Sequence, residues 1–172
     1  MAARRMQADR TPGVLDAGEK PADARCGGPI DLAFIDGMHL SEFVLRDFIN
    51  VEQYCTRQSL IVLHDSLPQN FEMTERQRRP LQRADKGLAA AWTGDVWRVL
   101  PLLQRERPDL CIQVIDCPPT GLVLIGNLDP ANQTLRQRQD QLSRLLIEQE
   151  ASEAEFWSFI ESVTVHDSRS MP

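Results

Sequence analysis

Two short apolar runs joined by an amphipathic stretch constrain the fold of this chain more than any other feature. The runs are Ile30–Ile35 and Leu60–Leu63. Between them, residues 40–55 carry apolar side chains at a spacing of three to four, as on one face of a helix. Parallel strands are buried on both faces and therefore tend to be continuously apolar. The order of the segments thus predicts a strand, a helix and a second, parallel strand.

Acidic and histidine side chains follow both predicted strands. Asp36 and His39 come after the first strand, and His64 and Asp65 come after the second. A right-handed crossover places the carboxyl ends of both strands at the same edge of the sheet, where open α/β sheets bind ligands. We therefore expect these four candidate catalytic residues to form one polar cluster. A histidine in such a cluster is suited to act as a general base, and a neighbouring aspartate to orient it.

The rest of the chain is expected to complete one α/β domain. Three segments differ in composition: a polar, irregular start (residues 1–28), an α/β domain (29–130), and two terminal helices with a polar tail (131–172). Within the domain we expect a helix over 96–107 and strands over 111–115 and 122–125. The long polar loop 66–92 contains a basic run that we expect to be solvated or, alternatively, to contact an anion.

Four further residues are expected to have local roles. Ser41 is placed to cap the helix that begins there. Asp95 is expected to stabilise the start of the next helix through its dipole, and Asp47 to pair locally on a helical face. Trp92 is expected to serve packing.

Charge and composition exclude several classes of function. The chain has 172 residues and a formal charge of −6, which disfavours nucleic-acid binding because phosphate contacts need a basic face. We see no apolar run long enough to span a membrane and no signal peptide. The four cysteines show no zinc-ligand spacing: Cys26, Cys55, Cys111 and Cys117. Reduced thiols of this kind are typical of a cytoplasmic protein.

Several short motifs occur in the order found in one enzyme family. They are Asp-Leu-Ala-Phe-Ile-Asp-Gly-Met-His at 31–39, Leu-His-Asp at 63–65, Gly-Asp-Val-Trp at 94–97, Arg-Pro-Asp-Leu at 107–110, Cys-Pro-Pro-Thr-Gly at 117–121 and Leu-Asp-Pro at 128–130. Over roughly residues 22–132 the chain resembles the C-terminal half of class I S-adenosylmethionine-dependent methyltransferases of the methyltransferase-24 type. The resemblance implies a partial Rossmann-like sheet with flanking helices. Its strands would be the last four of the seven-stranded fold, parallel with a final antiparallel hairpin.

The resemblance also implies an activity and a site. It implies O-methyl transfer from S-adenosylmethionine to a small hydroxylated acceptor, with Asp36 and Asp65 as possible ligands of a metal such as Mg²⁺. His64 stands where metal-dependent relatives have an acid, and imidazole suits zinc, iron or nickel better than magnesium. A metal-free site, with His39 or His64 as general base, is the alternative.

The chain departs from the family in one respect. No glycine-rich turn follows a strand here, and the pair Gly27-Gly28 precedes one. We therefore expect a truncated domain that binds S-adenosylmethionine weakly, or a non-catalytic fragment or pseudoenzyme that acts as an interaction module. A hydrolase is disfavoured because the sequence has no G-x-S-x-G motif. Strand Ile30–Ile35 would then form an exposed edge that pairs with a second copy or a partner chain.

Overall fold

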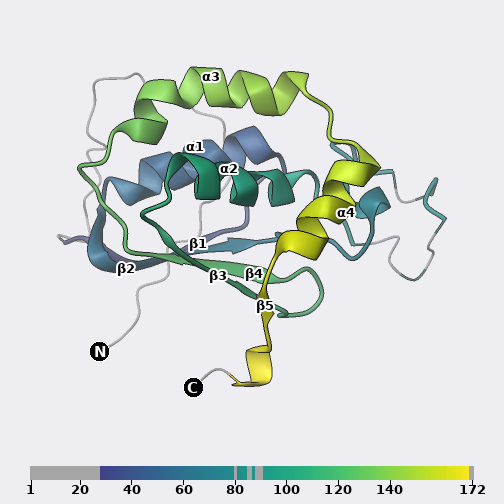
Figure 1. Ribbon diagram of the computed structural model, residues 1–172, viewed down its shortest axis with the longest axis horizontal. Coiled ribbons are helices and arrows are strands. Elements are labelled where there is room, and N and C mark those ends of the chain that lie inside the picture. Colours follow the sequence, from purple (N-terminus) through teal and green to yellow (C-terminus); the bar gives the residue numbers. More distant parts are fainter. Residues whose placement is uncertain (1–27, 80, 85–86, 88–90, 171–172) are drawn as a thin grey trace.

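The computed structural model describes residues 28–79, 81–84, 87 and 91–170 (Figure 1). The strands are β1 (Ile30–Ile35), β2 (Cys55–His64), β3 (Cys111–Ile115), β4 (Leu122–Gly126) and β5 (Val165–His166). The helices are α1 (Ser41–Glu52), α2 (Val99–Glu106), α3 (Thr134–Glu148) and α4 (Glu153–Ser162), with short 3₁₀ helices η1 (Phe71–Thr74), η2 (Val96–Arg98) and η3 (Ser168–Ser170). The predicted irregular segment 1–28 lies, except for its last residue, outside the described residues.

The described strands form one mixed sheet in the order β1-β2-β4-β3-β5. β1 and β2 are parallel, as are β3 and β5, whereas β4 runs antiparallel to both β2 and β3. The predicted α/β class, the parallel first pair and the antiparallel β3–β4 hairpin are confirmed. β5 was not predicted.

The boundary between the first helix and the second strand differs from the prediction. α1 ends at Glu52, and β2 already begins at Cys55, which pairs with Ile30. The hydroxyl of Ser59 donates to the carbonyl of Ile30 at 2.5 Å, so a polar segment joins the sheet at its edge. Residues 56–59 are polar and are held in the strand by this pairing, so the sequence pattern indicated only the apolar half of β2.

Helices cover one face of the sheet. α1 and α2 lie over the strands, and α3 packs on α1 further from the sheet (Figure 1). Buried apolar side chains from all these layers form one core, among them Leu45, Phe48, Ile61, Leu63, Leu100, Leu103, Val123, Ile125, Leu142 and Leu146. None of the described helices has the length and apolar character that crossing a bilayer requires.

A buried ion pair ties the carboxyl end of α1 to the rest of the domain. Glu52 accepts from the guanidinium of Arg107 at 2.9 Å and from the backbone N–H of Asp129 at 3.2 Å. Arg107 also pairs with Asp109, and this pairing holds the pKa of Asp109 below its ordinary range. The ion pair thus anchors α1 at its carboxyl end, opposite the amino end that faces the residues described below.

β1 lies at one end of the described sheet and pairs there with β2. An apolar strand with free backbone groups on one side is a template for pairing with another chain. We propose that two copies of the chain associate through this edge. Size-exclusion chromatography with light scattering is expected to give a mass of about twice 19.5 kDa. A stable monomer at high protein concentration would show instead that the edge is covered.

Candidate active site

Two strand ends that lie side by side position the candidate site. β1 ends at Ile35, which is in register with Leu63 of β2, so the next residue of each strand is at the same level. Asp36 and His64 therefore meet at the carboxyl edge of the sheet, and Asp65 follows at the start of the next loop. Because the two strands are parallel neighbours, only a few ångströms separate these side chains.

The four residues predicted as catalytic form one cluster. The Oδ2 atom of Asp65 lies 3.2 Å from Nδ1 of His39 and 3.1 Å from Nδ1 of His64. The Oδ1 atom of Asp36 lies 3.4 Å from Nδ1 of His64 and 3.7 Å from Nε2 of His39. The structure thus brings all four side chains together, while their roles remain predictions.

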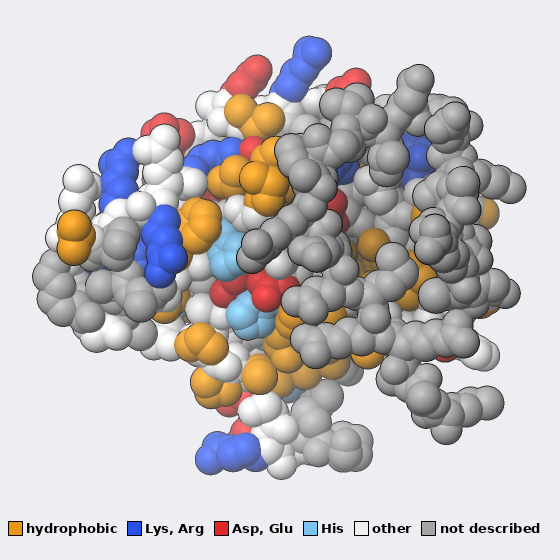
Figure 2. Space-filling model, turned by 180° about the vertical axis from the view of Figure 1, so that it is seen from behind, with side chains coloured by type: hydrophobic (Ala, Val, Ile, Leu, Met, Phe, Trp, Pro, Cys, Tyr) orange, Lys and Arg blue, Asp and Glu red, His pale blue; other side chains and the backbone are white. Residues whose placement is uncertain are grey.

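The two carboxylates of the cluster differ in their access to solvent. The side chain of Asp65 is 7% exposed, whereas that of Asp36 is 44% exposed and those of the histidines are about a quarter exposed. Figure 2 shows histidine and acidic side chains gathered near the middle of one face, with hydrophobic side chains beside them. An incoming molecule therefore meets Asp36 and the imidazole rings first, with Asp65 behind them.

Backbone strain is concentrated at the cluster. Three non-glycine residues of the described chain have positive φ, and two of them are His39 at 55° and Asp65 at 57°. This left-handed conformation costs about 1–3 kcal/mol for such residues and persists where the surrounding structure enforces it. Such strain gathers at functional sites, which supports the assignment of this cluster as the candidate site.

His39 is held by a segment that follows it by more than 50 residues in sequence. Its Nδ1 atom lies 2.7 Å from the carbonyl oxygen of Trp92, and the two rings stack with centroids 4.9 Å apart and an interplanar angle of 9°. Gly94, at φ 57°, packs so closely on the carbonyl of His39 that a Cβ atom there would lie 1.6 Å from its oxygen. Trp92 thus packs as predicted, but against His39, a contact that no sequence pattern indicated.

Three of the cluster residues have a geometry compatible with a metal ion. Asp36, His64 and Asp65 each offer one ligand atom, and these atoms lie within 4.8 Å of one another. Among the described residues, Nδ1 of His64 is buried without a hydrogen-bond partner, although both carboxylates are near it. A set of one imidazole and two carboxylates suits Mn²⁺, Fe²⁺ or Zn²⁺ better than it suits Mg²⁺, which prefers oxygen ligands alone.

Asp47 does not join the cluster. Its carboxylate lies 3.7 Å from Arg46, the neighbouring residue in the chain, as the local-pairing prediction had it. Burial raises the pKa of Asp47, and the charge of Arg46 opposes this rise. The side chain also faces Gly37, where a Cβ atom would lie 3.4 Å from Oδ2. Asp47 therefore lies beside the turn that leads from Asp36 to His39.

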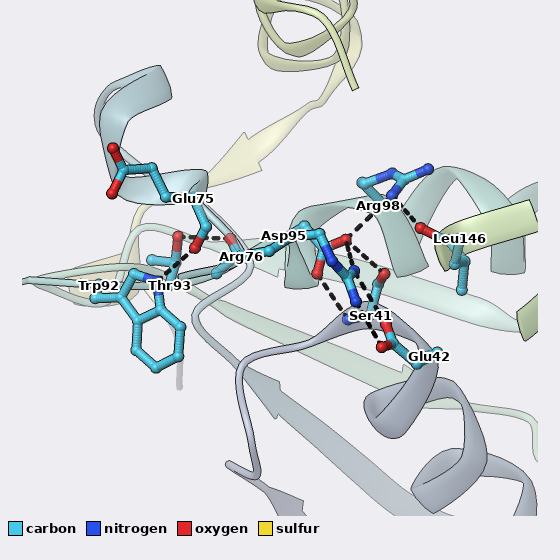
Figure 3. A network of polar contacts seen from close by, with 10 residues as sticks. Ser41, Glu42, Glu75, Arg76, Trp92, Thr93, Asp95, Arg98 and Leu146 are labelled. Carbon is cyan, nitrogen blue, oxygen red and sulfur yellow. Dashed lines mark hydrogen bonds and ion pairs between the residues drawn. The ribbon is translucent and has the colours of Figure 1, made fainter. Parts of the chain in front are cut away.

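A second polar network, centred on Asp95, fixes the helix layer beside the cluster (Figure 3). Asp95 accepts from the backbone N–H and the hydroxyl of Ser41, both at 2.9 Å. It also accepts from Arg76 at 2.6 Å and from Arg98 at 3.1 Å, and Arg76 in turn donates two hydrogen bonds to Glu42. Three separate segments therefore meet on one buried carboxylate.

This network corrects one prediction and bears on two others. Ser41 is the first helical residue of α1 and bonds to Asp95, whereas the helix cap is Leu40, so the predicted capping role of Ser41 was wrong. Asp95 stands at the start of η2, as predicted, but its side chain makes no cap bond there and accepts instead from Ser41, Arg76 and Arg98, so its dipole role stays a prediction. Of the basic run, Arg76 is paired with Glu42 and Asp95, whereas positions 78 and 79 are exposed, as expected for a solvated loop.

Comparison with known families adds to this geometry. A family model described as a methyltransferase domain matches residues 7–66, a segment that contains β1, α1, β2 and the whole cluster. This part of the chain is therefore similar to a methyltransferase domain. The match confirms the resemblance to class I S-adenosylmethionine-dependent methyltransferases, a family that in general uses that cofactor. No curated protein and no solved structure matches the chain.

The extent of the match differs from the extent of the sequence motifs. The motifs span roughly residues 22–132, whereas the matched segment begins at residue 7 and ends at residue 66, in the N-terminal part of the chain. The assignment to the C-terminal half of the family domain, and with it the truncation, therefore stays a prediction.

Proposed function

We propose that the protein transfers a methyl group to a hydroxyl oxygen of a small acceptor, and that the reaction takes place at the carboxyl edge of β1 and β2. The observation that carries this proposal is the meeting of His39, His64, Asp36 and Asp65 within 3.1–3.7 Å at two parallel strand ends. The match of residues 7–66 to a methyltransferase domain supports methyl transfer. The imidazole–carboxylate pairs supply a base that can accept the proton of an acceptor hydroxyl.

Each residue of the cluster has a distinct role in this proposal. S-adenosylmethionine supplies the methyl group when bound. The acceptor hydroxyl must lose its proton as its oxygen attacks, and His39 takes that proton as general base. Asp36, 3.7 Å from Nε2 of His39, stabilises the positive imidazolium that results. Asp65 lies 3.2 Å from Nδ1 of His39 and 3.1 Å from Nδ1 of His64, so its negative charge faces both rings.

A divalent metal ion is compatible with the same residues. Asp36, His64 and Asp65 would hold it, and an ion there lowers the pKa of a bound hydroxyl. The unpartnered Nδ1 atom of His64 supports this possibility, because a buried ring nitrogen without a partner is costly. We propose a transition-metal ion rather than Mg²⁺ for a metal-dependent form of the site.

A non-catalytic interaction module is the second candidate function. The missing glycine-rich turn after a strand favours it, because that turn supplies the backbone contacts to the cofactor in relatives. In this case the domain keeps the fold and presents the β1 edge to a partner. We further propose a cytoplasmic location, in keeping with the free thiols of Cys55, Cys111 and Cys117.

Labelled methyl transfer tests the proposed function. The protein is incubated with millimolar S-adenosylmethionine carrying a deuterated methyl group and a panel of phenols, catechols and sugars, and products are identified by mass spectrometry. We expect a labelled methyl ether with the wild type. The rate is expected to fall at least ~100-fold in Asp36→Asn and His39→Gln, because each removes a group that accepts or stabilises the transferred proton.

Matched controls separate chemistry from folding. His166→Gln changes an exposed histidine of β5, and Asp140→Asn changes an exposed residue of α3, so both are expected to keep the wild-type rate. Parallel reactions with EDTA, Mg²⁺, Mn²⁺ or Zn²⁺ decide the metal question. No labelled product with any acceptor, at cofactor concentrations shown to saturate the protein, would favour the interaction module.

A further inference from the structure

The hydrogen bond between His39 and Trp92 determines which ring nitrogen of His39 carries the hydrogen. A backbone carbonyl oxygen only accepts, so at 2.7 Å from the Trp92 oxygen the Nδ1 atom of His39 must be the donor. The nearby Oδ2 atom of Asp65, at 3.2 Å, is also an acceptor and favours the same arrangement. In the neutral ring the lone pair then resides on Nε2.

Trp92 is itself firmly held. Its indole N–H donates to the carbonyl of Glu75 at 2.5 Å, and its ring lies parallel to the ring of His39 (Figure 3 shows the bond to Glu75). The next residue, Thr93, is fully buried and donates from both its N–H and its hydroxyl to the carbonyl of Met73. The carbonyl of Trp92 therefore has a fixed place relative to His39.

The opposite side of the His39 ring faces Asp36. Its Nε2 atom lies 3.7 Å from Asp36, whose side chain is the most exposed of the four in the cluster. Gly94 presses on the backbone carbonyl of His39 and keeps the residue in its left-handed conformation. The ring is thus held by Trp92 on its Nδ1 side and faces Asp36 on its Nε2 side.

We propose that Trp92 is a positioning residue that fixes the ring plane and the Nδ1–H tautomer of His39, so that Nε2 is the nitrogen presented to the acceptor hydroxyl. The role of Nε2 rests on the proposed function, whereas the tautomer does not. Trp92 acts through two contacts that one residue supplies together: the carbonyl that accepts from Nδ1 and the indole that stacks on the ring.

Long-range ¹H–¹⁵N NMR at a pH where imidazole is neutral tests the tautomer directly. The chain has three histidines, and the His39→Gln variant identifies the signals of His39. In the wild type we expect the hydrogen on Nδ1 with about a tenfold preference, the effect of one good hydrogen bond. A hydrogen on Nε2 in the wild type would overturn the proposal whether or not the protein transfers methyl groups.

Variants of Trp92 test its part in this arrangement. Trp92→Ala removes the stacking ring and the anchor to Glu75, and we expect the Nδ1–H preference to fall severalfold, with Asp65 retaining part of it. Trp92→Phe keeps a stacking ring and is expected to retain most of the preference. Trp157→Ala, which removes an exposed tryptophan on α4, serves as the control and is expected to leave the His39 signals unchanged. Backbone spectra verify that each variant is folded.

Kinetics give a second readout. With a working acceptor, Trp92→Ala is expected to lower kcat about tenfold with little change in KM, and Trp92→Phe to recover most of it. If Trp92→Ala fails to fold, Trp92→Phe and the wild-type spectrum still decide the matter. An unchanged His39 tautomer in folded Trp92→Ala would remove Trp92 from this role. An inactive wild type with the Nδ1–H tautomer would contradict the proposed function but not the proposal that Trp92 fixes the tautomer of His39.

Discussion

Replacing Asp95 by alanine is expected to lower the free energy of unfolding by about 3 kcal/mol. Asp95 is 4% exposed and accepts from the N–H and hydroxyl of Ser41, from Arg76 and from Arg98. Without it, the hydroxyl and N–H of Ser41 lose their partner and Arg98, which is also largely buried, loses its counter-charge. Arg76 is partly exposed and keeps Glu42, so its share of the loss is small.

Urea unfolding followed by circular dichroism measures this effect. Asp140→Ala, at an exposed position of α3, is the matched control and is expected to change stability by no more than about 0.5 kcal/mol. The stability loss of Asp95→Asn is expected to lie between those of Asp140→Ala and Asp95→Ala, because an amide oxygen still accepts from Ser41 while the charge is lost. A loss below about 1 kcal/mol in Asp95→Ala would contradict the view that this network secures the helix layer.

Replacing Gly94 by alanine is expected to cost about 3 kcal/mol and to displace His39. Gly94 has φ 57°, a conformation unfavourable for alanine, and the added Cβ would lie 1.6 Å from the carbonyl oxygen of His39 and 2.7 Å from its carbon. These are backbone atoms, so no side-chain rotation relieves the overlap. The two segments must move apart, which weakens the contact between Trp92 and His39.

Gly126→Ala is the matched control for this substitution. Gly126 ends β4, and a Cβ atom there would have no heavy atom within 4 Å. The stability of the Gly126→Ala variant is therefore expected to be close to that of the wild type. The His39 NMR signals are expected to shift in Gly94→Ala and to stay in place in Gly126→Ala. Wild-type stability of Gly94→Ala, with unshifted His39 signals, would show that the close approach is not as the structure has it.

The strands illustrate what an apolar pattern predicts well. β1 and β3 were predicted with the boundaries that the structure has, and β4 to within one residue, because strands buried in a sheet leave continuous apolar runs. β2 was predicted only over Leu60–Leu63, since its first half is polar and is held by pairing with Ile30. β5 consists of two exposed residues that pair with β3 at the edge of the sheet, so no local sequence pattern predicts this strand.

The cluster itself was accessible to sequence reasoning. Asp36, His39, His64 and Asp65 follow two strands of one parallel unit, and the geometry of such a unit brings strand ends together whatever the rest of the chain does. The sequence alone therefore determined which side chains meet at this edge, and it indicated the similarity to a methyltransferase domain.

Only the tertiary structure decided how the cluster is held. Trp92, Gly94 and Asp95 lie more than 50 residues beyond His39 and Ser41, and they meet them through a stacked ring, a backbone contact and a buried carboxylate. Sequence reasoning gave Trp92 and Asp95 only packing and helix-start roles, because each type of residue is common in such places. Contacts between distant segments depend on the packing of the whole fold, so they leave no periodic or local signal in the chain.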